Sequence, residues 1–433
     1  MVEPVLVPGW VIIGTLVSLS CKRLVATLVA LLACAWAGTA VLGASLPPST
    51  WVALTPLPQQ GGTAIFALGV SPANNQVVVA GTGTGALIRS ADGGSTWKVA
   101  HSGSGGVLTI AFSPNKPGMV FAGTRGTGAL ASQDGGLTWA AVKGMEGRSV
   151  RAFAFALTLV AAGTDHGVYV STDGLTWRPS GLPNTSIGAL AVTAIHDPVR
   201  LVAGGDAASA TGGMPLFQST DGGTTWAQMR PGISGKVVSC VAAGPLPPTG
   251  NVRPLLVGTN AGLFTSRDNG ATFTPNSGGG LLPSTDYTQI GFITTHYDRY
   301  YAASDGGGSA LGGLWKTRDA GRSFTSLAPP MSSVTALTVS NDEAPVLYVA
   351  TFRPADQVAL LWAYHDTGGP PQGPPSTVTP SASGTRTSPP ASAGTSFLTD
   401  FLFSSRTPYI LIGLAALVVI VFAVVSHFRG RRG

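Results

Sequence analysis

Cysteine and histidine are both scarce in this chain of 433 residues, which holds three cysteines and six histidines. Cys21 and Cys34 lie in an apolar N-terminal stretch and Cys240 stands alone, so the spacing offers no framework of disulfides. The histidines are scattered, and neither a paired cysteine motif nor an alternating run of acids accompanies them. We therefore expect no metal site and no bound cofactor, and we expect Cys240 to be a buried, unreactive thiol.

Charged side chains are also few, at 10% of the residues. The formal net charge is +6, but acidic and basic side chains nearly balance between Trp51 and Asp366, and the excess of Lys and Arg lies in the flanking segments. A nucleic-acid surface needs Lys and Arg clustered on the folded domain itself. We therefore exclude nucleic acid as a partner, and we expect a monomer.

An eight-residue pattern, which we call the box, recurs six times in the middle of the chain. Each copy starts with Ser or Thr, has Asp at its third position, continues with Gly and ends on an aromatic residue. The copies are Ser90–Trp97, Ser132–Trp139, Ser171–Trp177 (one residue shorter), Ser219–Trp226, Ser266–Phe273 and Thr317–Phe324. Successive box aspartates are 42, 39, 48, 47 and 51 residues apart. A period of about 40 to 50 residues is typical of a β-propeller with one blade per repeat.

Short β-prone runs precede every box, which predicts four strands per repeat with the box between the third and fourth. The second-strand run, as in Val77–Thr82, occurs seven times, once more than the intact box. The seventh repeat ends at Asp366 without a following Thr-Trp, whereas Ser49–Leu54 reads as an outer strand that lacks a box. We therefore predict an all-β, seven-bladed β-propeller with four-stranded blades over residues 45–366. We expect the N-terminal strand to close the ring by pairing into the last blade, which removes an exposed sheet edge.

The residues of the box suit a hairpin turn. Its Asp accepts backbone hydrogen bonds, its Gly adopts angles that other residues avoid, and its aromatic ring is large enough to pack between sheets. The pattern resembles the Asp-box, or bacterial neuraminidase, repeat of sialidases, xyloglucan-type endoglucanases, sortilin-type receptors and photosystem II assembly factors. In those families the box lies on the face away from the binding site. The resemblance therefore implies a purely structural role for the aspartates Asp92, Asp134, Asp173, Asp221, Asp268, Asp319 and Asp366.

The segments outside the propeller read as membrane and targeting sequences. Residues 1–44 form a leader in which Lys22 and Arg23 precede an apolar run, typical of a signal peptide or of an uncleaved anchor. Residues 367–406 are rich in Pro, Ser, Thr and Gly and read as a stalk. Residues 407–427 have the length and composition of a transmembrane helix, and the basic residues in 428–433 predict a cytoplasmic tail. We expect a cell-membrane protein with a single C-terminal anchor and an extracellular propeller.

Ligands of propellers usually bind at the central channel, on the face built by the connections between second and third strands and between blades. The polar residues predicted on that face form a ring of mixed charge that is suited to a polar ligand. Its members are Arg125, Glu146, Arg148, Asp165, His166, Asp206, Asn260, Asp286, Tyr287, Asp305, Arg353 and Asp356. The alternative is that these residues only solvate their turns.

A catalytic role has limited support in the sequence. Glycosidases use two carboxylates at a set separation, or a tyrosine nucleophile in sialidases, and the propeller has two glutamates, Glu146 and Glu343. The remaining candidates for catalysis are Asp165, Asp206 and Asp305. The early Arg-Ile-Pro signature of sialidases is absent.

The resemblance is nearest to the photosystem II assembly factors, because of the predicted blade count and the compact loops. It implies a non-catalytic binding or assembly module for an extracellular protein or glycan. The stalk and the C-terminal anchor depart from the usual form of that family. An anchored glycoside hydrolase, sialidase-like or endoglucanase-like, is the alternative from another class, and a surface lectin is a third.

Overall fold

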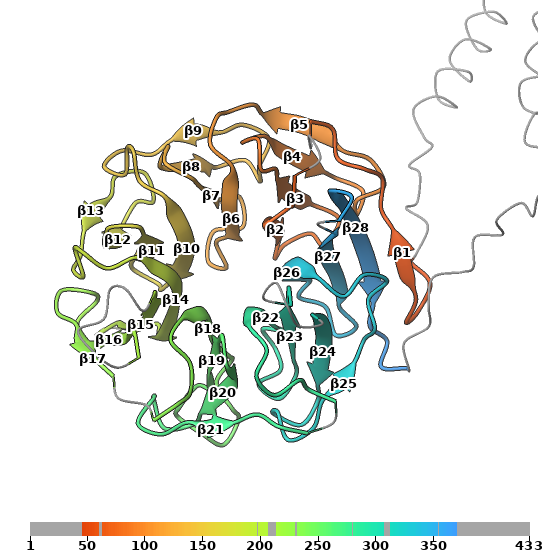
Figure 1. Ribbon diagram of the computed structural model, residues 1–433. Coiled ribbons are helices and arrows are strands. Elements are labelled where there is room, and N and C mark those ends of the chain that lie inside the picture. The colour runs from red at the N-terminus through yellow and green to blue at the C-terminus, as the bar shows by residue number, and fades with distance from the viewer. Residues whose placement is uncertain are drawn as a thin grey trace, which may run out of the picture. The chain divides into compact units, whose positions relative to one another are not determined.

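Twenty-eight short strands form a ring of seven sheets in the computed structural model (Figure 1). The structure describes residues 46–59, 63–196, 198–206, 214–229, 232–278, 280–306, 312–353 and 355–369. Blade 1 consists of β2 (Ala67–Val70), β3 (Val78–Gly81), β4 (Leu87–Ser90) and β5 (Lys98–His101), and blade 2 of β6 (Val107–Phe112), β7 (Val120–Thr124), β8 (Ala129–Ser132) and β9 (Ala140–Ala141). Blade 3 consists of β10 (Val150–Phe155), β11 (Val160–Thr164), β12 (Gly167–Ser171) and β13 (Arg178–Pro179), and blade 4 of β14 (Ile187–Ala194), β15 (Arg200–Gly205), β16 (Leu216–Ser219) and β17 (Ala227–Gln228). Blade 5 consists of β18 (Val238–Ala243), β19 (Leu255–Thr259), β20 (Gly262–Ser266) and β21 (Thr274–Pro275), and blade 6 of β22 (Tyr287–Phe292), β23 (Tyr300–Ser304), β24 (Gly313–Thr317) and β25 (Thr325–Ser326). Blade 7 consists of β26 (Val334–Val339), β27 (Val346–Arg353), β28 (Val358–His365) and the N-terminal strand β1 (Trp51–Ala53).

Each blade is an antiparallel meander of four strands, with its first strand at the centre of the ring and its fourth at the outside (Figure 1). The middle strands carry runs of Val, Leu and Ala, and strands such as β7 and β11 are buried along their whole length. Such continuous apolar runs are expected where a sheet is covered on both faces by neighbouring sheets. The prediction of an all-β, seven-bladed propeller with four-stranded blades is confirmed.

Strand β1 closes the ring by pairing with β28 in the seventh blade, whose order is β1-β28-β27-β26. Trp51 lies opposite Tyr364 in this pairing, and their ring centroids are 4.8 Å apart. The Trp51 side chain is fully buried, and its indole N–H donates to the carbonyl of Leu327 in blade 6 over 2.8 Å. The two ends of the ring are therefore joined by a sheet and by an aromatic contact, as predicted.

Apolar side chains from adjacent blades interlock to form the core between them. One cluster contains Ala161 of β11 and Leu201 of β15, and another contains Val79 of β3 and Val120 of β7. Backbones approach closely in these layers. A side chain on Gly258, for example, would place its Cβ only 2.2 Å from the backbone carbonyl oxygen of Tyr287 in the next blade. A glycine is therefore required at this position.

The boxes form the turns between third and fourth strands. In the first box the Asp92 carboxylate accepts the Thr96 N–H over 2.8 Å and the Thr96 hydroxyl over 2.6 Å, and Ser90 Oγ donates to it over 2.7 Å. Gly94 in this turn has a φ of +87°. The same contacts recur around Asp134, Asp221, Asp268 and Asp319, and the shorter box of Asp173 keeps the Ser and backbone bonds.

Hydrogen bonds to these carboxylates lower their pKa values. The Thr272 hydroxyl, the Thr272 N–H and the Ser266 hydroxyl together hold the pKa of Asp268 at about 2. The Thr225 hydroxyl and N–H do the same for Asp221, whose pKa is also about 2. Every polar atom of the carboxylate is thus engaged within its own turn, and this local geometry is that of a structural element.

Asp366 differs from the other six and is not the aspartate of a seventh box turn. Its side chain is fully buried between blades 6 and 7, where it accepts hydrogen bonds from Lys316 Nζ (2.8 Å), Tyr301 Oη (2.7 Å) and the Gly368 N–H (3.0 Å). Arg318 Nη2 lies 3.4 Å away. The residue joins the end of blade 7 to blade 6 through a buried ion pair. No box turn forms here because β1 takes the place of the outer strand that a box would have introduced.

The segments predicted to target or anchor the protein lie outside the described residues. These are residues 1–44, the stalk beyond Gly369, the helix at 407–427 and the tail at 428–433. Within the described ranges, the structure has no helix with the length and hydropathy needed to cross a membrane.

Candidate functional site

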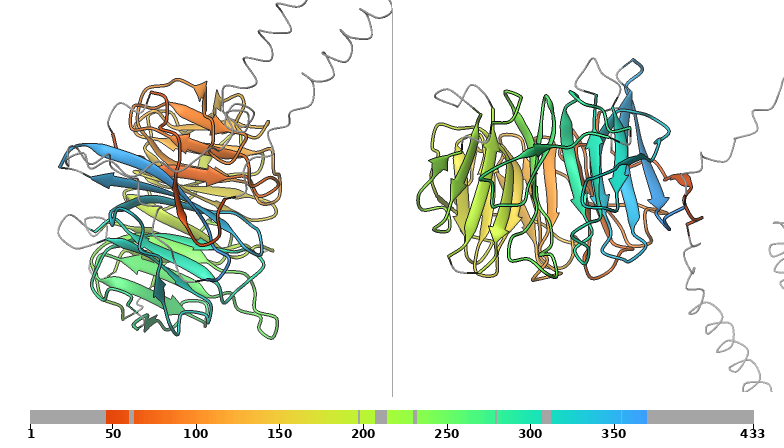
Figure 2. Two further views of the ribbon diagram at one scale, coloured as in Figure 1. Left: turned by 90° about the vertical axis from the view of Figure 1, so that its right-hand side faces the viewer. Right: turned by 90° about the horizontal axis from the view of Figure 1, so that it is seen from below.

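The strands run between two faces of the ring, as the right-hand view of Figure 2 shows. The six boxes and the connections between first and second strands lie on one face, which we call the box face. The connections between second and third strands and between blades lie on the other, which we call the mouth face. Because the carboxylates of the boxes are engaged in their own turns, they are not available to a ligand on the box face.

A β-bulge at the start of the inner strand recurs in blades 2 to 7. In blade 3, for example, the pairing of β10 with β11 skips from Val150 to Ala152, so Arg151 is the extra residue. A bulge re-aims one side chain out of the ladder. The bulge residues of the six blades are Leu108, Arg151, Gly188, Ser239, Thr288 and Thr335. In blade 1, Phe66 precedes β2 at the corresponding place.

These seven residues line the entrance to the central channel, which we call the mouth. The mouth encloses a cavity of about 640 Å³, and a narrower channel of about 320 Å³ continues between the inner strands of all seven blades. Cavities of ~300–1,000 Å³ are typical of ligand sites. One residue from each blade therefore sets the chemistry of the site.

The chemistry of the mouth changes around the ring. Blades 1 and 2 present Phe66, which is 43% exposed, and Leu108. Blade 3 presents Arg151, and blade 4 presents Gly188, where a Cβ would meet no atom within 4 Å. At the bulge positions, blades 5 to 7 carry the hydroxyl residues Ser239, Thr288 and Thr335. Ser239 Oγ donates to Asp286 and Thr335 Oγ1 donates to the carbonyl of Ile65, whereas the Thr288 hydroxyl is buried and has no hydrogen-bond partner among the described residues. The site thus combines an apolar arc, a cationic side chain, an open notch and a hydroxyl arc.

Arg125 and Asp305 are the two residues of the predicted ring that directly line the mouth. Arg125 is exposed and follows β7, whereas Asp305 is half-buried and follows β23. Asp286 lies beside this rim and accepts a hydrogen bond from Ser239 Oγ over 2.5 Å. Burial raises the pKa of Asp286, the bond from Ser239 opposes that rise, and the neighbouring carboxylate of Asp305 adds to it.

Asp206 and Asp165 are the other two candidates for catalysis. Asp206 lies near Arg151 of the mouth, whereas Asp165 binds the backbone of Ser149. Asp206 Oδ2 is 3.9 Å from Arg151 Nη1, and both side chains are more than 40% exposed. Asp165 accepts the Ser149 N–H over 3.1 Å and lies 3.3 Å from His166 Nδ1. Asp165 therefore holds the connection that carries Ser149, which itself lines the mouth.

The remaining predicted residues support turns or the core. Glu146 accepts the Gly144 N–H within its own turn, and Asn260 accepts the Lys236 N–H over 2.8 Å. Arg353 forms a two-bond pair with Asp356 at the tip of the β27–β28 hairpin, at 2.8 and 2.7 Å.

Two further residues of the predicted ring, Arg148 and Tyr287, lie just before or at the start of an inner strand. Arg148 is half-buried, and its backbone carbonyl accepts the Gly128 N–H over 2.8 Å. The structure corrects the prediction that Tyr287 belongs to the binding ring. The Tyr287 side chain is fully buried, it packs against Trp315 with ring centroids 5.6 Å apart, and its hydroxyl donates to the carbonyl of Leu282. Tyr287 starts the inner strand of blade 6, so it occupies the core position and the next residue, Thr288, faces the mouth.

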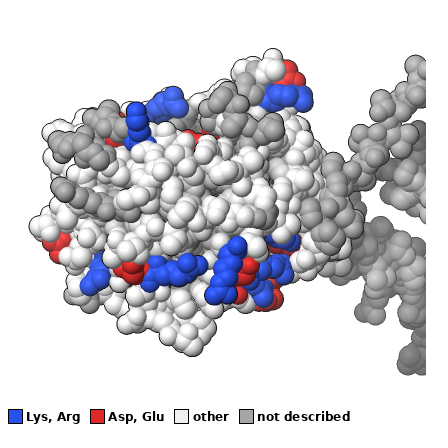
Figure 3. All heavy atoms as spheres, turned by 60° about the horizontal axis from the view of Figure 1, so that its bottom comes forward, with Lys and Arg blue, Asp and Glu red and all other residues white. Residues whose placement is uncertain are grey.

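Charged side chains of both signs gather toward the upper and lower edges of the ring in Figure 3, and the wall between them is mainly uncharged. Among the described residues, no group of three or more His, Cys, Asp or Glu side chains is placed to hold a metal ion. The polar chemistry of the described part of the chain is thus concentrated at its two faces.

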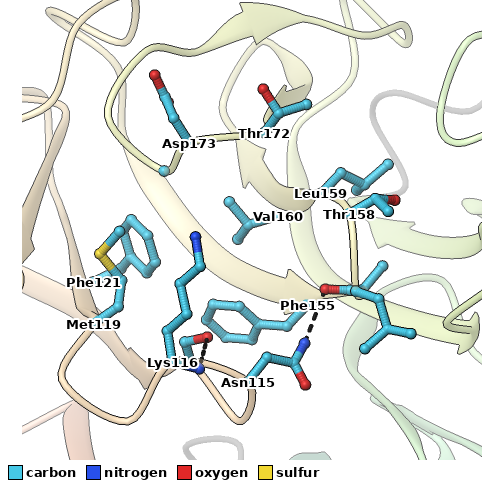
Figure 4. A pocket seen from close by; sticks show the side chains of 14 residues that line it. Asn115, Lys116, Met119, Phe121, Phe155, Thr158, Leu159, Val160, Thr172 and Asp173 are labelled. Carbon is cyan, nitrogen blue, oxygen red and sulfur yellow. Dashed lines mark hydrogen bonds between the residues drawn. The ribbon is translucent and has the colours of Figure 1, made fainter.

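A small cavity of about 50 Å³ also lies on the box face, between blades 2 and 3 (Figure 4). Figure 4 shows the Lys116 side chain extending between Phe121 and Val160, while the Asn115 amide donates to the carbonyl of Ala156 over 3.1 Å. The cavity is too small for a drug-sized ligand, and its carboxylate, Asp173, belongs to a box. The mouth is therefore the better candidate for a binding site.

Comparison with family models gave no match, and no curated protein matched the sequence. Solved structures do match in three dimensions. YCF48 from Cyanidioschyzon merolae superposes with a TM-score of 0.52 and 14% identity, covering 73% of this chain and 98% of that one. YCF48 bound to D1 peptide has a TM-score of 0.50 and 15% identity, covering 73% and 94% of the two chains.

A third match has a different kind of repeat. The RRP9 WD40 repeats superpose with a TM-score of 0.55 and 14% identity, covering 73% of this chain and 97% of that chain. At these identities the likeness shows the fold alone. The chain therefore shares its fold with these proteins, and its function has to be argued from the mouth.

Proposed function

We propose that the protein is a non-catalytic binding or assembly propeller that holds a segment of a partner protein at the mouth. The observation that carries this proposal is the ring of seven bulge-position residues, one from each blade. Phe66 and Leu108 offer an apolar contact, Arg151 and Arg125 offer a positive charge, and the polar side chains that line the mouth on blades 5 to 7, Gln289 among them, offer hydrogen bonds. A protein segment carries all three kinds of complementary group, so it satisfies the whole ring.

The similarity to YCF48 supports this choice, because that propeller has been solved bound to the D1 peptide. The boxes, with their Asp-box resemblance, serve as turn supports on the opposite face. The proposal extends to an extracellular propeller on a C-terminal membrane anchor, which the composition of residues 367–433 supports. An extracellular glycan is the other ligand class that the polar arc accommodates.

A glycoside hydrolase is the alternative, and one observation favours it. Asp286 and Asp305 lie close enough for one carboxylate to raise the pKa of the other, and a carboxylic acid with a raised pKa is the usual general acid of a glycosidase. Purified full-length protein should be assayed with sialosides and β-glucans. Turnover that is lost in both Asp286→Asn and Asp305→Asn would replace the binding proposal with the hydrolase.

The binding proposal is tested by placing a photo-crosslinking p-benzoylphenylalanine at Phe66 in the full chain and illuminating intact cells. We expect a protein adduct of defined mass. The matched control is the same crosslinker at Leu137, which is 56% exposed but lies in a box.

The second variant is Gly188→Trp, which places a large ring in the notch beside Arg151, where an added Cβ meets no atom within 4 Å. It should leave the melting temperature unchanged and reduce the Phe66 adduct at least tenfold. An adduct that is equally strong at Leu137, or that survives in Gly188→Trp, would contradict binding at the mouth.

A further inference from the structure

A second hollow lies on the box face, between blades 5 and 6, and it differs from the mouth in its chemistry. This groove of about 280 Å³ is mainly apolar. One wall comes from the β18–β19 connection and includes Pro247 and Pro254, and the other comes from Tyr297 and Tyr300 of blade 6. Arg267 and Ala320, from two neighbouring boxes, border it.

Grooves lined by aromatic side chains are the surfaces that recognise extended proline-rich segments, and two tyrosines line this one. Tyr297 is half-buried, so one part of its side chain is covered and another part is open to solvent. Arg267 is held across the two boxes because its Nη2 donates to the carbonyl of Ala320 over 2.6 Å. A polyproline II helix has no internal hydrogen bonds, so its carbonyls need donors such as the other N–H groups of Arg267.

The chain leaves the propeller beside blade 6, which forms one wall of this groove. A Cβ on Gly368 would lie 2.7 Å from Nη1 of Arg318, so the backbone at Gly368 runs along that side chain. Arg318 precedes Ala320, one border of the groove, by two residues. The sequence after Gly369 is Pro-Pro-Gln-Gly-Pro-Pro, residues 370–375. Six residues in a polyproline II conformation span ~19 Å, at ~3.1 Å per residue.

We propose that the proline-rich segment 370–375 binds in the groove between blades 5 and 6 of its own chain. The segment is tethered directly to blade 7, so its effective concentration at the groove is in the millimolar range and a weak site is sufficient. The contact would fix the direction in which the polypeptide leaves the ring, on the box face and away from the mouth. This inference is independent of the function proposed for the mouth.

The test uses the full chain with p-benzoylphenylalanine in place of Gln372. Illumination should give an adduct with the mass of a single chain, and proteolytic mapping should place the crosslink on the peptide that contains Tyr297 or on residues 247–254. Tyr297→Ala should reduce the adduct at least fivefold. Arg322→Ala is the matched control, because Arg322 is exposed on the same blade but does not line the groove, and it should leave the yield unchanged.

A variant outside the propeller guards against loss of fold. Replacing Pro374 and Pro375 by Gly leaves every described residue intact and should also reduce the intrachain adduct. Crosslinks to a second copy of the chain, to another protein or to a different blade would overturn the proposal. An intrachain adduct whose yield is unchanged by both Tyr297→Ala and the Pro→Gly variant would overturn it as well.

Discussion

The buried ion pair between Lys316 of blade 6 and Asp366, next to the closing strand pair, gives the sharpest prediction for stability. Asp366→Asn removes the negative charge but keeps the shape of the side chain. The Lys316 ammonium, whose side chain is 8% exposed, then loses its only buried counter-charge among the described residues. Removing one partner of a buried pair costs ~3–5 kcal/mol, because the other charge stays in a medium of low polarity.

The expected change in melting temperature follows from the size of the propeller. Unfolding entropy is about 2.1 cal/mol/K per residue near 60 °C, so roughly 320 residues give ~0.7 kcal/mol/K. A loss of ~3–5 kcal/mol therefore lowers the Tm by about 4 to 7 °C. Tryptophan fluorescence is the appropriate probe, because Trp51 is packed on Tyr364 at the same closure.

The matched control is Asp356→Asn, which breaks an exposed pair with Arg353. The side chains of that pair are 56% and 46% exposed, so solvent screens the interaction and its loss should leave the Tm nearly unchanged. The double variant Asp366→Asn with Lys316→Met should be more stable than the sum of its single variants, because no buried charge remains unpaired. If Asp366→Asn and Asp356→Asn lower the Tm equally, the reasoning about the closure is wrong.

The same carboxylate predicts a dependence on pH. Burial opposes ionisation, but the hydrogen bonds from Lys316 and Tyr301 outweigh it and hold the pKa of Asp366 below its ordinary value of 3.8. A lowered folded-state pKa contributes stability that is complete above the ordinary value and is lost as the pH falls through the folded value. Wild-type protein should therefore lose stability below about pH 4 more steeply than Asp366→Asn does.

Three other outcomes follow from single contacts. Gly258→Ala should cost ~1–3 kcal/mol by overpacking against the Tyr287 carbonyl, whereas Gly188→Ala, with open space around it, should stay within ~0.5 kcal/mol; equal melting curves would refute the packing argument. Cys240 is half-buried beside the central channel, where burial raises the pKa of its thiol and the thiol donates to the carbonyl of Tyr287, so a thiol reagent should label the native protein much more slowly than the denatured protein, and equal rates would contradict that placement. Asp268, with a pKa of about 2, should contribute stability that is lost between about pH 4 and pH 2, and Asp268→Asn should remove that part of the acid sensitivity; an unchanged acid titration would count against the box geometry.

The architecture could be predicted because its signals are local and repeated. The box carries its own hydrogen-bonding partners within five residues, so a pattern in the sequence is enough to place a turn. Closure by Trp51 could also be predicted, since a lone outer-strand sequence at one end complements a blade without one at the other. These features follow from neighbours in the chain or from simple counting.

The mouth could be predicted only in part, because its composition depends on strand register. Arg125 and Asp305 lie in connections between second and third strands, where a polar residue in the sequence is expected to face solvent. Arg151 is not part of the predicted polar ring, because it belongs to an inner strand and is turned toward the mouth by a bulge. A signal was present: in blades 2 to 7 the mouth residue directly follows the buried residue that starts the inner strand, as Thr288 follows Tyr287.

Contacts between residues far apart in the sequence were the second feature that the sequence could not predict. Asp366 falls in register with the box aspartates, and the repeat alone predicts that it makes the same turn. Its actual partner, Lys316, is 50 residues away in the neighbouring blade, and no local pattern links the two. Contacts of this kind depend on how blades face each other, which the period of the repeat does not specify.

The placement of every blade, and of the mouth between them, depends on the ring being closed by β1. Val52 and Ala363 face each other across the β1–β28 pairing. In a hydrogen-bonded antiparallel pair the Cα atoms are ~5.5 Å apart, which is within the ~4.4–6.8 Å that a disulfide spans. The most direct measurement is therefore mass spectrometry of the oxidised Val52→Cys, Ala363→Cys protein. An intrachain disulfide between these positions is expected, and its absence in folded protein, or a bond from position 52 to Cys240 instead, would contradict the closed ring.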